Sequence, residues 1–462
     1  MLNEVSDNRL RVYLQNVVAK SMFRSSLKNL RLCGSRIIVT GSVPAVFLLS
    51  SGDSAKLWGT ASCRSPWACP HCTPRVMAQK GNDIACAIDA LAKWHKQYAC
   101  MITFTLPHTK FMSCEDTLKI LKLTWRHFIR AGNKGFVTSS YTLKLSVDEK
   151  NHRGGKASGM KGDVHTYKRS NGAYGEMREN LQIEHSVRVY EFTYGENGWH
   201  PHIHALFWIP KDKFNSILDY ENRLIDLWWH CAKYEAKKYY EKKGDTNAAA
   251  CVDEFYPEWK KITADGHKAL YISKNKAGKP VKQQSSHYVA GWSADRELTG
   301  ANVKTAREGH LTPFDILEKS SAAYLLADTA EAKKWSDLFL EYARTTFGSR
   351  RVEYSKSGLT AIIKKYKQSE EYTIKLKKKC TDKAKEWHVV CWFSKQQWSE
   401  IYLINQYEDG NLVKNLLEAA IKENAREEIA LFLEEYDIRL IEYEHPLERQ
   451  IISGLFDSKL TA

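Results

Sequence analysis

Short apolar runs alternate along the chain with longer segments in which apolar residues recur every three or four positions. The runs at 36–40 and 45–49 predict strands. Residues 76–97 then predict one amphipathic helix, residues 98–106 a strand, and residues 114–130 a second helix. The first part of the chain is therefore expected to follow a strand-helix order.

Further along, the same kind of pattern predicts a β-hairpin at 187–209, a helix near 212–240 and a strand near 268–273. Residues 148–182 are polar, rich in Gly, Lys and Arg, and have no period, so we expect an exposed loop there. Strands interleaved with long helices indicate the α+β class, built on one central, mainly antiparallel sheet.

From about residue 320 the pattern turns helical, with helices expected near 321–346 and 411–436. A basic run at 375–380, KLKKKC, fits either a solvated helix face or a DNA contact. We therefore expect a helical, basic C-terminal region over residues 319–462.

The predicted hairpin carries the most informative stretch of the sequence. The turn is expected at Gly195–Gly198 (Gly-Glu-Asn-Gly), where turn-forming residues separate two runs rich in β-branched and aromatic residues. Closing the hairpin with Tyr194 opposite Trp199 places Glu191 opposite His202. The cross-strand pairing is then fixed along both strands.

Three histidines of this hairpin share one face, because strand side chains alternate and His200, His202 and His204 occupy alternate positions. Glu191 joins them from the opposite strand. Two imidazoles and one carboxylate form a three-ligand site with open positions for water and substrate oxygens, which predicts Mg²⁺ or Mn²⁺. Only two histidines are needed, so His200 is a supporting or DNA-facing residue. The alternative is a surface strand that merely carries histidines.

Clustered cysteines predict a second metal site. Cys63, Cys69 and Cys72 lie in CRSPWACPHC, whose CPHC end resembles a zinc knuckle, because a two-residue spacing lets both thiolates bind one ion. Unliganded thiols are the alternative interpretation. The remaining cysteines are mostly scattered, which favours small hydrophobic core residues over a disulfide framework.

The charge balance favours a polyanionic partner. Lys and Arg number 69 against 54 Asp and Glu, which gives a formal net charge of +15. Nucleic acid offers such a partner, since basic side chains gain affinity by releasing its condensed counterions. No apolar run approaches the roughly 20 residues that span a bilayer, and the N-terminal residues lack a signal-peptide layout, so we expect a cytoplasmic protein without a membrane partner.

Several runs together resemble the HUH class of DNA-nicking enzymes. His202-Ile203-His204 resembles the HUH signature, and its HPHIH form is similar to that of plasmid rolling-circle Rep proteins. FTLPH at 104–108 resembles the first motif of the class, and residues 189–204 resemble the second. YVAGWSADRELTG at 288–300 resembles the tyrosine motif, and LTPFDIL at 311–317 resembles the run downstream of that motif.

This resemblance implies a rolling-circle replication initiator of bacterial cytoplasm, a metal-dependent DNA endonuclease and strand transferase. In such enzymes one tyrosine attacks the scissile phosphodiester, leaving a 5′-phosphotyrosyl enzyme and a free 3′-hydroxyl. The implied partners are origin DNA with a single-stranded nick site, a host helicase and a DNA polymerase. A phenol is a weak nucleophile at neutral pH, so the chemistry needs a cation such as the hairpin would hold.

Two tyrosines compete as the nucleophile. Tyr288 begins a helix-like stretch, and the ELTG and TPFDIL runs follow it at the spacing usual in the family, so we prefer it. Tyr271, in ALYISK, keeps a lysine three residues on, as the family does, but its surroundings alternate like a strand. If Tyr288 is the nucleophile, Tyr271 is a strand residue that is packed or lines a DNA groove.

The sequence departs from the family pattern after Tyr288. The usual lysine three residues on is replaced by Gly291, so the missing positive charge is assigned to Lys274, Lys282 or Arg296. Some relatives place a glutamate base four residues before the tyrosine, and this sequence has a glutamine there. Glu297 or Asp295 could serve as the base instead. Polar residues on a helix face are, however, more often simply solvated.

The resemblance also supplies a fourth zinc ligand, because relatives carry a similar cluster after an upstream cysteine. That cysteine is Cys33, with His71 as the alternative ligand and a core cysteine as the other interpretation of Cys33. We therefore expect a zinc-binding module with a connecting helix over 1–94 and an HUH endonuclease domain over 95–318, before the C-terminal region. Rival functions are an HUH transposase or mobilisation relaxase, and an origin-binding protein without nicking activity.

Overall fold

The computed structural model of the chain describes residues 27–34, 36–38, 44–51, 55–70, 72–134, 141–144, 164–166, 172–252, 269–275, 277–283, 310–379, 388–407 and 411–441. Its contacts define two compact units, each built from separated stretches of chain. The first unit comprises Met1–Lys80, Thr299–Arg350 and Lys365–Ala462, and the second comprises Gly81–Leu298 and Arg351–Lys364. The three consecutive domains expected from the sequence stay a prediction.

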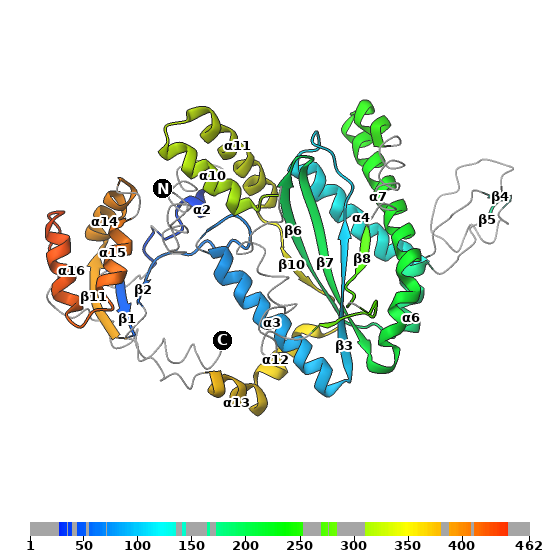
Figure 1. Cartoon of the computed structure of the whole chain (residues 1–462), viewed down its shortest axis with the longest axis horizontal. Helices are drawn as coiled ribbons and strands as arrows, with labels where there is room; N and C mark the ends of the chain where they lie inside the picture. The colour runs from blue at the N-terminus through cyan, green and yellow to red at the C-terminus, as the bar shows by residue number, and fades with distance from the viewer. Residues whose placement is uncertain are drawn as a thin grey trace. The chain divides into compact units, whose positions relative to one another are not determined.

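The second unit contains the central sheet, with the strand order β10-β6-β7-β3-β8 and the short β9 paired to β3 (Figure 1). Every pairing in it is antiparallel, as predicted. The strands are β3 (Gln97–Thr105), β6 (Ser186–Gly195), β7 (Gly198–Pro210), β8 (Leu270–Ile272), β9 (Lys282–Gln283) and β10 (Val352–Tyr354). The mixed α+β class expected from the sequence is confirmed.

The β6–β7 hairpin has the predicted register. Tyr194 lies opposite Trp199 and Glu191 lies opposite His202, and the strands close at Gly195 and Gly198. The sequence could define this pairing because the turn residues and the alternation of side chains both point to it.

Gly198 ends the turn with a φ of +83°, in the left-handed region, and an added Cβ would lie 3.0 Å from Lys110 Cα. We expect Gly198→Ala to lower the free energy of unfolding by about 2 to 4 kcal/mol, from backbone strain plus displacement of that segment. Gly244 is the matched control, since its φ is +79° but nothing lies within 4 Å of the same Cβ. Urea unfolding should show a smaller loss for Gly244→Ala, and equal losses would contradict this account.

Helices cover one face of the central sheet (Figure 1). They are α4 (Cys114–Lys134), α6 (Ala173–Asn180), the 3-10 helix η2 (Lys211–Tyr220) and α7 (Glu221–Lys243). Phe104 of β3 packs against Trp125, Phe128 and Trp228, with ring centroids 5.0 to 5.3 Å apart. Because side chains alternate along a strand, Thr103 and Thr105 on either side of Phe104 belong to the other face.

The predicted exposed loop at 148–182 is partly wrong. Its last residues form α6, and β4 (Tyr141–Lys144) pairs with β5 (Val164–Thr166), while 145–163 and 167–171 lie outside the described residues. The helix has only eight residues, so its local pattern is weak. It is stabilised by tertiary packing, because Tyr174 is buried with its ring centroid 5.0 Å from that of Phe128.

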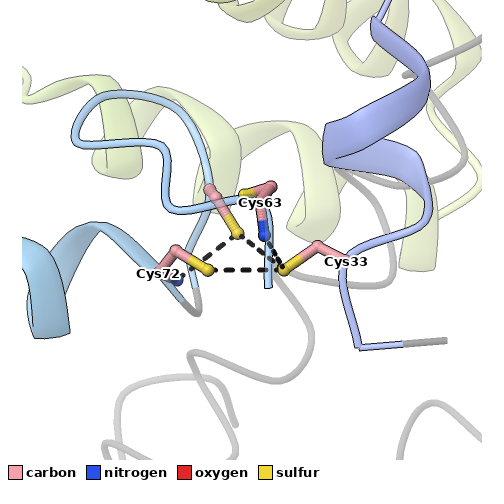
Figure 2. Close-up of side chains that lie close together, drawn as sticks. Cys33, Cys63 and Cys72 are labelled. Atoms are coloured by element: carbon pink, nitrogen blue, oxygen red, sulfur yellow. Dashed lines mark hydrogen bonds between the residues drawn. The ribbon is translucent and has the colours of Figure 1, made fainter. Parts of the chain in front are cut away.

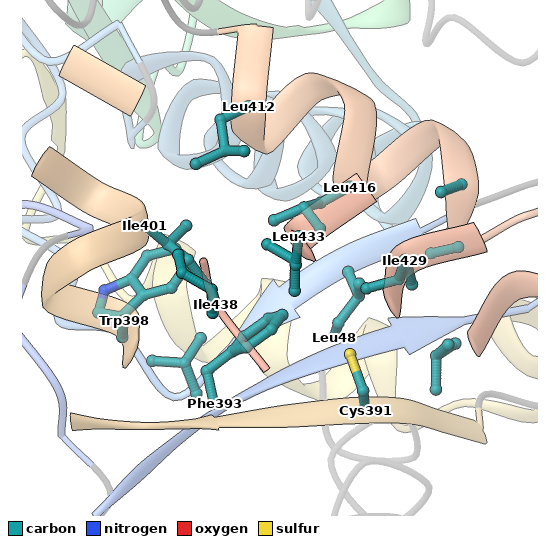
Figure 3. Packing of buried hydrophobic residues seen from close by; sticks show 14 residues of the cluster. Leu48, Cys391, Phe393, Trp398, Ile401, Leu412, Leu416, Ile429, Leu433 and Ile438 are labelled. Carbon is teal, nitrogen blue, oxygen red and sulfur yellow. The ribbon is translucent and has the colours of Figure 1, made fainter. Parts of the chain in front are cut away.

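The first unit contains a smaller sheet in the order β11-β1-β2, antiparallel throughout. These strands are β1 (Ala45–Ser50), β2 (Ala55–Trp58) and β11 (His388–Ser394). One face packs on the helices α14 (Lys395–Tyr407), α15 (Asn411–Ala419) and α16 (Ala425–Glu434). Figure 3 shows this core, in which Leu48 and Phe393 from the strands meet Trp398, Leu416 and Leu433 from the helices.

The C-terminal region expected to be helical also contains the strand β11. Its buried run pairs with β1, so Val46 lies opposite Phe393 although the two are far apart in sequence. A local apolar pattern does not reveal a pairing partner so distant, and a short run buried on both faces lacks the alternation that marks a strand. The helices predicted at 411–436 are confirmed by α15 and α16.

The remaining helices include two that pair in the first unit, α10 (Pro313–Leu325) and α11 (Thr329–Thr346). The others are α2 (Lys28–Arg31), α3 (Cys72–Trp94), α12 (Leu359–Lys367) and α13 (Glu370–Lys379). Within the described ranges, none of the helices combines the length and apolarity required to cross a bilayer.

Candidate functional site

The predicted hairpin ligands gather on the sheet face opposite α4 and α7. His204 Nε2 lies 2.6 Å from Glu191 Oε2, and the two form a hydrogen bond. The ring of His202 lies beside that of His204, with centroids 6.0 Å apart and the planes nearly parallel. Both imidazoles and the carboxylate therefore lie on one face of the β6–β7 hairpin.

Two threonines of β3 also contact this site. Thr103 lies opposite His204, and Thr105 lies opposite His202, in the β3–β7 register. Thr103 Oγ1 is 2.9 Å from His204 Nδ1, and Thr105 Oγ1 is 3.2 Å from His202 Nδ1. Each predicted histidine ligand thus has its Nδ1 atom hydrogen-bonded to a hydroxyl group of the neighbouring strand. Neither threonine was predicted as a site residue, although their alternate positions in the strand run are visible in the sequence.

The charge state of Glu191 suits a metal ligand. Burial by itself raises the pKa of this carboxyl, but the hydrogen bond with His204 and the electrostatic interactions with His204, His202 and Arg351 lower it to about 2. Glu191 is therefore ionised at neutral pH, as a carboxylate ligand must be.

His200 extends the site along the strand, with its ring centroid 4.2 Å from that of His202. On its other side it contacts His108, at a centroid distance of 4.4 Å. His108 belongs to the FTLPH run, and its Nδ1 lies 3.2 Å from the Leu106 carbonyl oxygen, which can only accept the hydrogen bond. His200 was predicted as a supporting residue of the site, whereas His108 was not predicted as a site residue.

Tyr271 belongs to the same sheet face as the histidines. It lies opposite Thr103 in the β3–β8 register, and Thr103 lies opposite His204, so the three residues form one cross-strand row. Tyr271 is 38% exposed, which leaves its phenol accessible to a ligand. The sequence correctly placed Tyr271 in a strand, and that strand carries it to the site.

The predicted supporting lysines have other contacts. Lys274 forms an ion pair with Glu221, the first residue of α7. Lys282 lies over the ring of Tyr98, 4.4 Å from its centroid. Tyr288, Gly291, Asp295, Arg296 and Glu297 lie outside the described residues, as does His71.

The LTPFDIL run starts a helix. Thr312 N donates to Asp315 Oδ2 at 2.8 Å, and Asp315 N donates to Thr312 Oγ1 at 3.2 Å. This reciprocal pair is a capping box, and Pro313 in the first turn suits it because proline needs no partner for an N–H group. The run therefore fixes the beginning of α10.

The four predicted cysteine ligands form a compact cluster in the first unit, and Figure 2 labels three of them, Cys33, Cys63 and Cys72. Cys33 Sγ lies 3.4 Å from Cys72 Sγ and 3.7 Å from Cys69 Sγ. All four sulfur atoms, including that of Cys63, lie within 4.8 Å of one another. Four thiolates around one zinc ion, each about 2.3 Å from it, require sulfur separations of roughly 3.8 Å, so the cluster fits a tetrahedral zinc site.

Hydrogen bonds within the cluster shift the thiol pKa values in opposite directions. Contacts from Cys33, and then from Cys63 and Cys69, lower the pKa of the Cys72 thiol, whereas contacts with Cys33 raise the pKa values of the Cys63 and Cys69 thiols. Cys33 is buried and shares these contacts, so its alternative interpretation as an isolated core cysteine is not supported by the geometry. A site with four cysteine ligands leaves no open position and points to a structural metal.

The cysteine loop is also fixed to α11. Trp67 is buried, and its Nε1 donates to the Ser349 carbonyl oxygen at 2.9 Å. Tyr342 of α11 contacts the same indole edge-on, with ring centroids 6.2 Å apart. The cysteine cluster therefore sits beside a packed contact between the N-terminal segment and α11.

Comparison with known proteins gives two distant relatives. Over 331 residues, the chain is 23% identical to Protein rep of Streptomyces lividans, covering 66% of this chain and 64% of that protein. Over 167 residues it is 27% identical to a neomycin resistance protein of Streptomyces cyanogenus, covering 35% of this chain and 33% of that protein. The matches thus span less than two thirds of either relative. No protein-family model and no solved structure matches the chain. By sequence, the chain is similar at low identity to a Rep protein.

Proposed function

We propose that this chain is a metal-dependent DNA endonuclease and strand transferase that initiates rolling-circle replication. The observation that carries the proposal is the site on the sheet face opposite α4 and α7, where His204 and Glu191 are in contact and His202 lies beside them. The similarity to Protein rep supports the same conclusion independently of the geometry. The net charge of +15 suits a nucleic-acid partner.

The donor set fits a small divalent cation. Glu191, His202 and His204 would hold Mg²⁺ or Mn²⁺, and three protein ligands leave positions for water and phosphate oxygens. A bound ion of this kind supplies a Lewis acid that polarises the phosphodiester and offsets charge on the departing oxygen. The four-cysteine cluster would hold zinc separately, as a structural element.

The proposed reaction joins a tyrosine to DNA. The phenol loses its proton as its oxygen forms a bond to phosphorus, the bond from phosphorus to the 3′-oxygen breaks, and the 3′-oxygen takes up a proton. The products are a 5′-phosphotyrosine and a 3′-hydroxyl that can prime synthesis. A host helicase and a DNA polymerase are the proposed partners that would unwind the nicked DNA and extend its 3′-hydroxyl.

The identity of the tyrosine is part of the proposal. Tyr288 is the candidate from the sequence pattern, and Tyr271 is the candidate that the described geometry supports. The strand position that counted against Tyr271 does not exclude it, because β8 carries it to the metal face, in one row with Thr103 and His204. Phosphodiester attack requires the phenol and the metal ligands on one side of the sheet, a condition that Tyr271 meets.

A covalent-adduct experiment tests this proposal. The full chain is incubated with Mn²⁺ and 3′-labelled single strands prepared from the DNA that flanks its own gene, and the products are separated on a denaturing gel. A 5′-phosphotyrosine retains the labelled fragment on the protein. We expect wild type to give the adduct, and only one of the two variants Tyr271→Phe and Tyr288→Phe to lose it.

Tyr234 supplies the matched control, because it is 49% exposed but lies on α7, which covers the other sheet face. Tyr234→Phe should keep the adduct. Persistence of the adduct in both test variants would contradict the tyrosine assignments. DNA binding with neither adduct nor nicked plasmid would instead support an origin-binding protein.

A further inference from the structure

The Nδ1 atoms of the two predicted histidine ligands meet hydroxyl groups from β3. The distances are 2.9 Å from Thr103 Oγ1 to His204 Nδ1 and 3.2 Å from Thr105 Oγ1 to His202 Nδ1. Thr103 is 1% exposed, so its hydrogen bond lies away from water, where it is strong and where losing it leaves a buried polar atom without a partner.

These contacts bear on which imidazole nitrogen can bind an ion. Nε2 of His204 faces Glu191 at 2.6 Å, so Nε2 is the atom on the ligand side of the ring. A nitrogen that binds a metal has no proton, so in the ligand state Nδ1 carries the proton and donates it to the threonine oxygen. A hydroxyl at this position can accept that hydrogen bond, and it holds the ring in the ligand orientation.

We propose that Thr103 and Thr105 are positioning residues that orient His204 and His202 for the divalent ion, an inference that rests on the proposed function. They act through the histidines and need not touch the ion or the DNA.

The location of the threonines suits precise positioning. β3 lies inside the sheet, with β7 on one side and β8 on the other, and Thr103 is paired with His204 and with Tyr271 across the two ladders. The backbone after it is held as well, because Thr105 N donates to the Ala269 carbonyl oxygen and Trp228 Nε1 donates to the Thr105 carbonyl oxygen, both at 2.8 Å. Side chains on such a rigid element fix geometry better than loop residues.

Direct measurement of Mn²⁺ binding by the full chain, without DNA, tests this inference. The electron paramagnetic resonance signal of free Mn²⁺ reports the dissociation constant. We expect Thr103→Val, which replaces the hydroxyl with a methyl group at nearly equal volume, to weaken Mn²⁺ affinity by about 10- to 100-fold. Thr103→Ser keeps the hydroxyl and should stay close to wild type. Thr105→Val should act in the same direction with a smaller effect, because its contact is longer and more exposed.

Thr124 provides a matched control, since it is buried in α4 and its hydroxyl makes no hydrogen bond among the described residues. Thr124→Val should leave Mn²⁺ affinity unchanged. Unchanged affinity in both Thr103→Val and Thr105→Val, or a Thr103→Ser variant as weak as Thr103→Val, would overturn the inference while leaving the metal site intact.

The failure of the proposed function has a different signature. If His204→Ala binds Mn²⁺ as tightly as wild type, the hairpin does not hold the ion, and both proposals fall together. Thermal melting of each variant shows whether an affinity loss comes from unfolding, and the serine variant keeps the test decisive if the valine variant folds poorly.

Discussion

His204→Ala should lower the rate of Mn²⁺-dependent plasmid nicking by about a thousandfold or more. The bound cation is expected to contribute several kcal/mol to the transition state, and each 1.4 kcal/mol is about tenfold in rate. His204 is central to the site because it contacts both Glu191 and Thr103. The measurement is conversion of supercoiled plasmid carrying the flanking DNA to the open circle.

Duplex binding should survive in the same variant, because phosphate contacts rather than the ion supply most of the affinity. His202→Ala should behave likewise, and Glu191→Ala should be milder, since two imidazoles can retain the ion weakly. His230, exposed on α7, serves as the control position, and its alanine variant should nick normally. Full nicking activity in His202→Ala or His204→Ala would contradict the assignment of these histidines as metal ligands.

The second large effect is expected at the cysteine cluster. Purified protein should contain about one tightly bound zinc ion, and Cys69→Ser or Cys72→Ser should release it. The loss should destabilise the first unit by several kcal/mol, which lowers its melting temperature by about 10 °C or causes aggregation. Metal analysis measures the zinc content, and thermal melting measures the loss of stability.

Cys251 is exposed and distant in sequence from the cluster, so Cys251→Ser is the control and should change neither quantity. If the protein contains no zinc and both cluster variants melt like wild type, the four thiols are only neighbours. The packing of Trp67 against Tyr342 makes the expected effect large, because the loop that carries Cys63 and Cys69 also anchors that contact.

The sequence was sufficient for features that depend on local pattern. The register of the β6–β7 hairpin followed from its turn and from side-chain alternation, so the shared face of Glu191, His202 and His204 could be predicted. Helix α3 and strand β3 followed from periodicity in the same way. The four-cysteine cluster was predicted from cysteine spacing together with the family resemblance.

Pairings between distant segments could not be predicted in this way. The place of Thr103 between His204 and Tyr271 depends on β3 joining both β7 and β8, and nothing local in the sequence specifies those neighbours. The same holds for β11, whose partner β1 lies near the other end of the chain. Residues that orient a ligand rather than bind it therefore emerged only from the structure.

The position of β1 in the middle of the small sheet has a consequence for synthesis of the protein. β1 leaves the ribosome early, but its partner β11 is made roughly 340 residues later. At ~5 to 20 residues per second, one edge of an entirely buried strand waits for about 20 to 70 s before its partner exists. During that time the nascent chain carries an open β edge, which is a site for wrong pairing and for chaperone binding. A ribosome that stops before residue 388 thus leaves a defect close to the other end of the polypeptide.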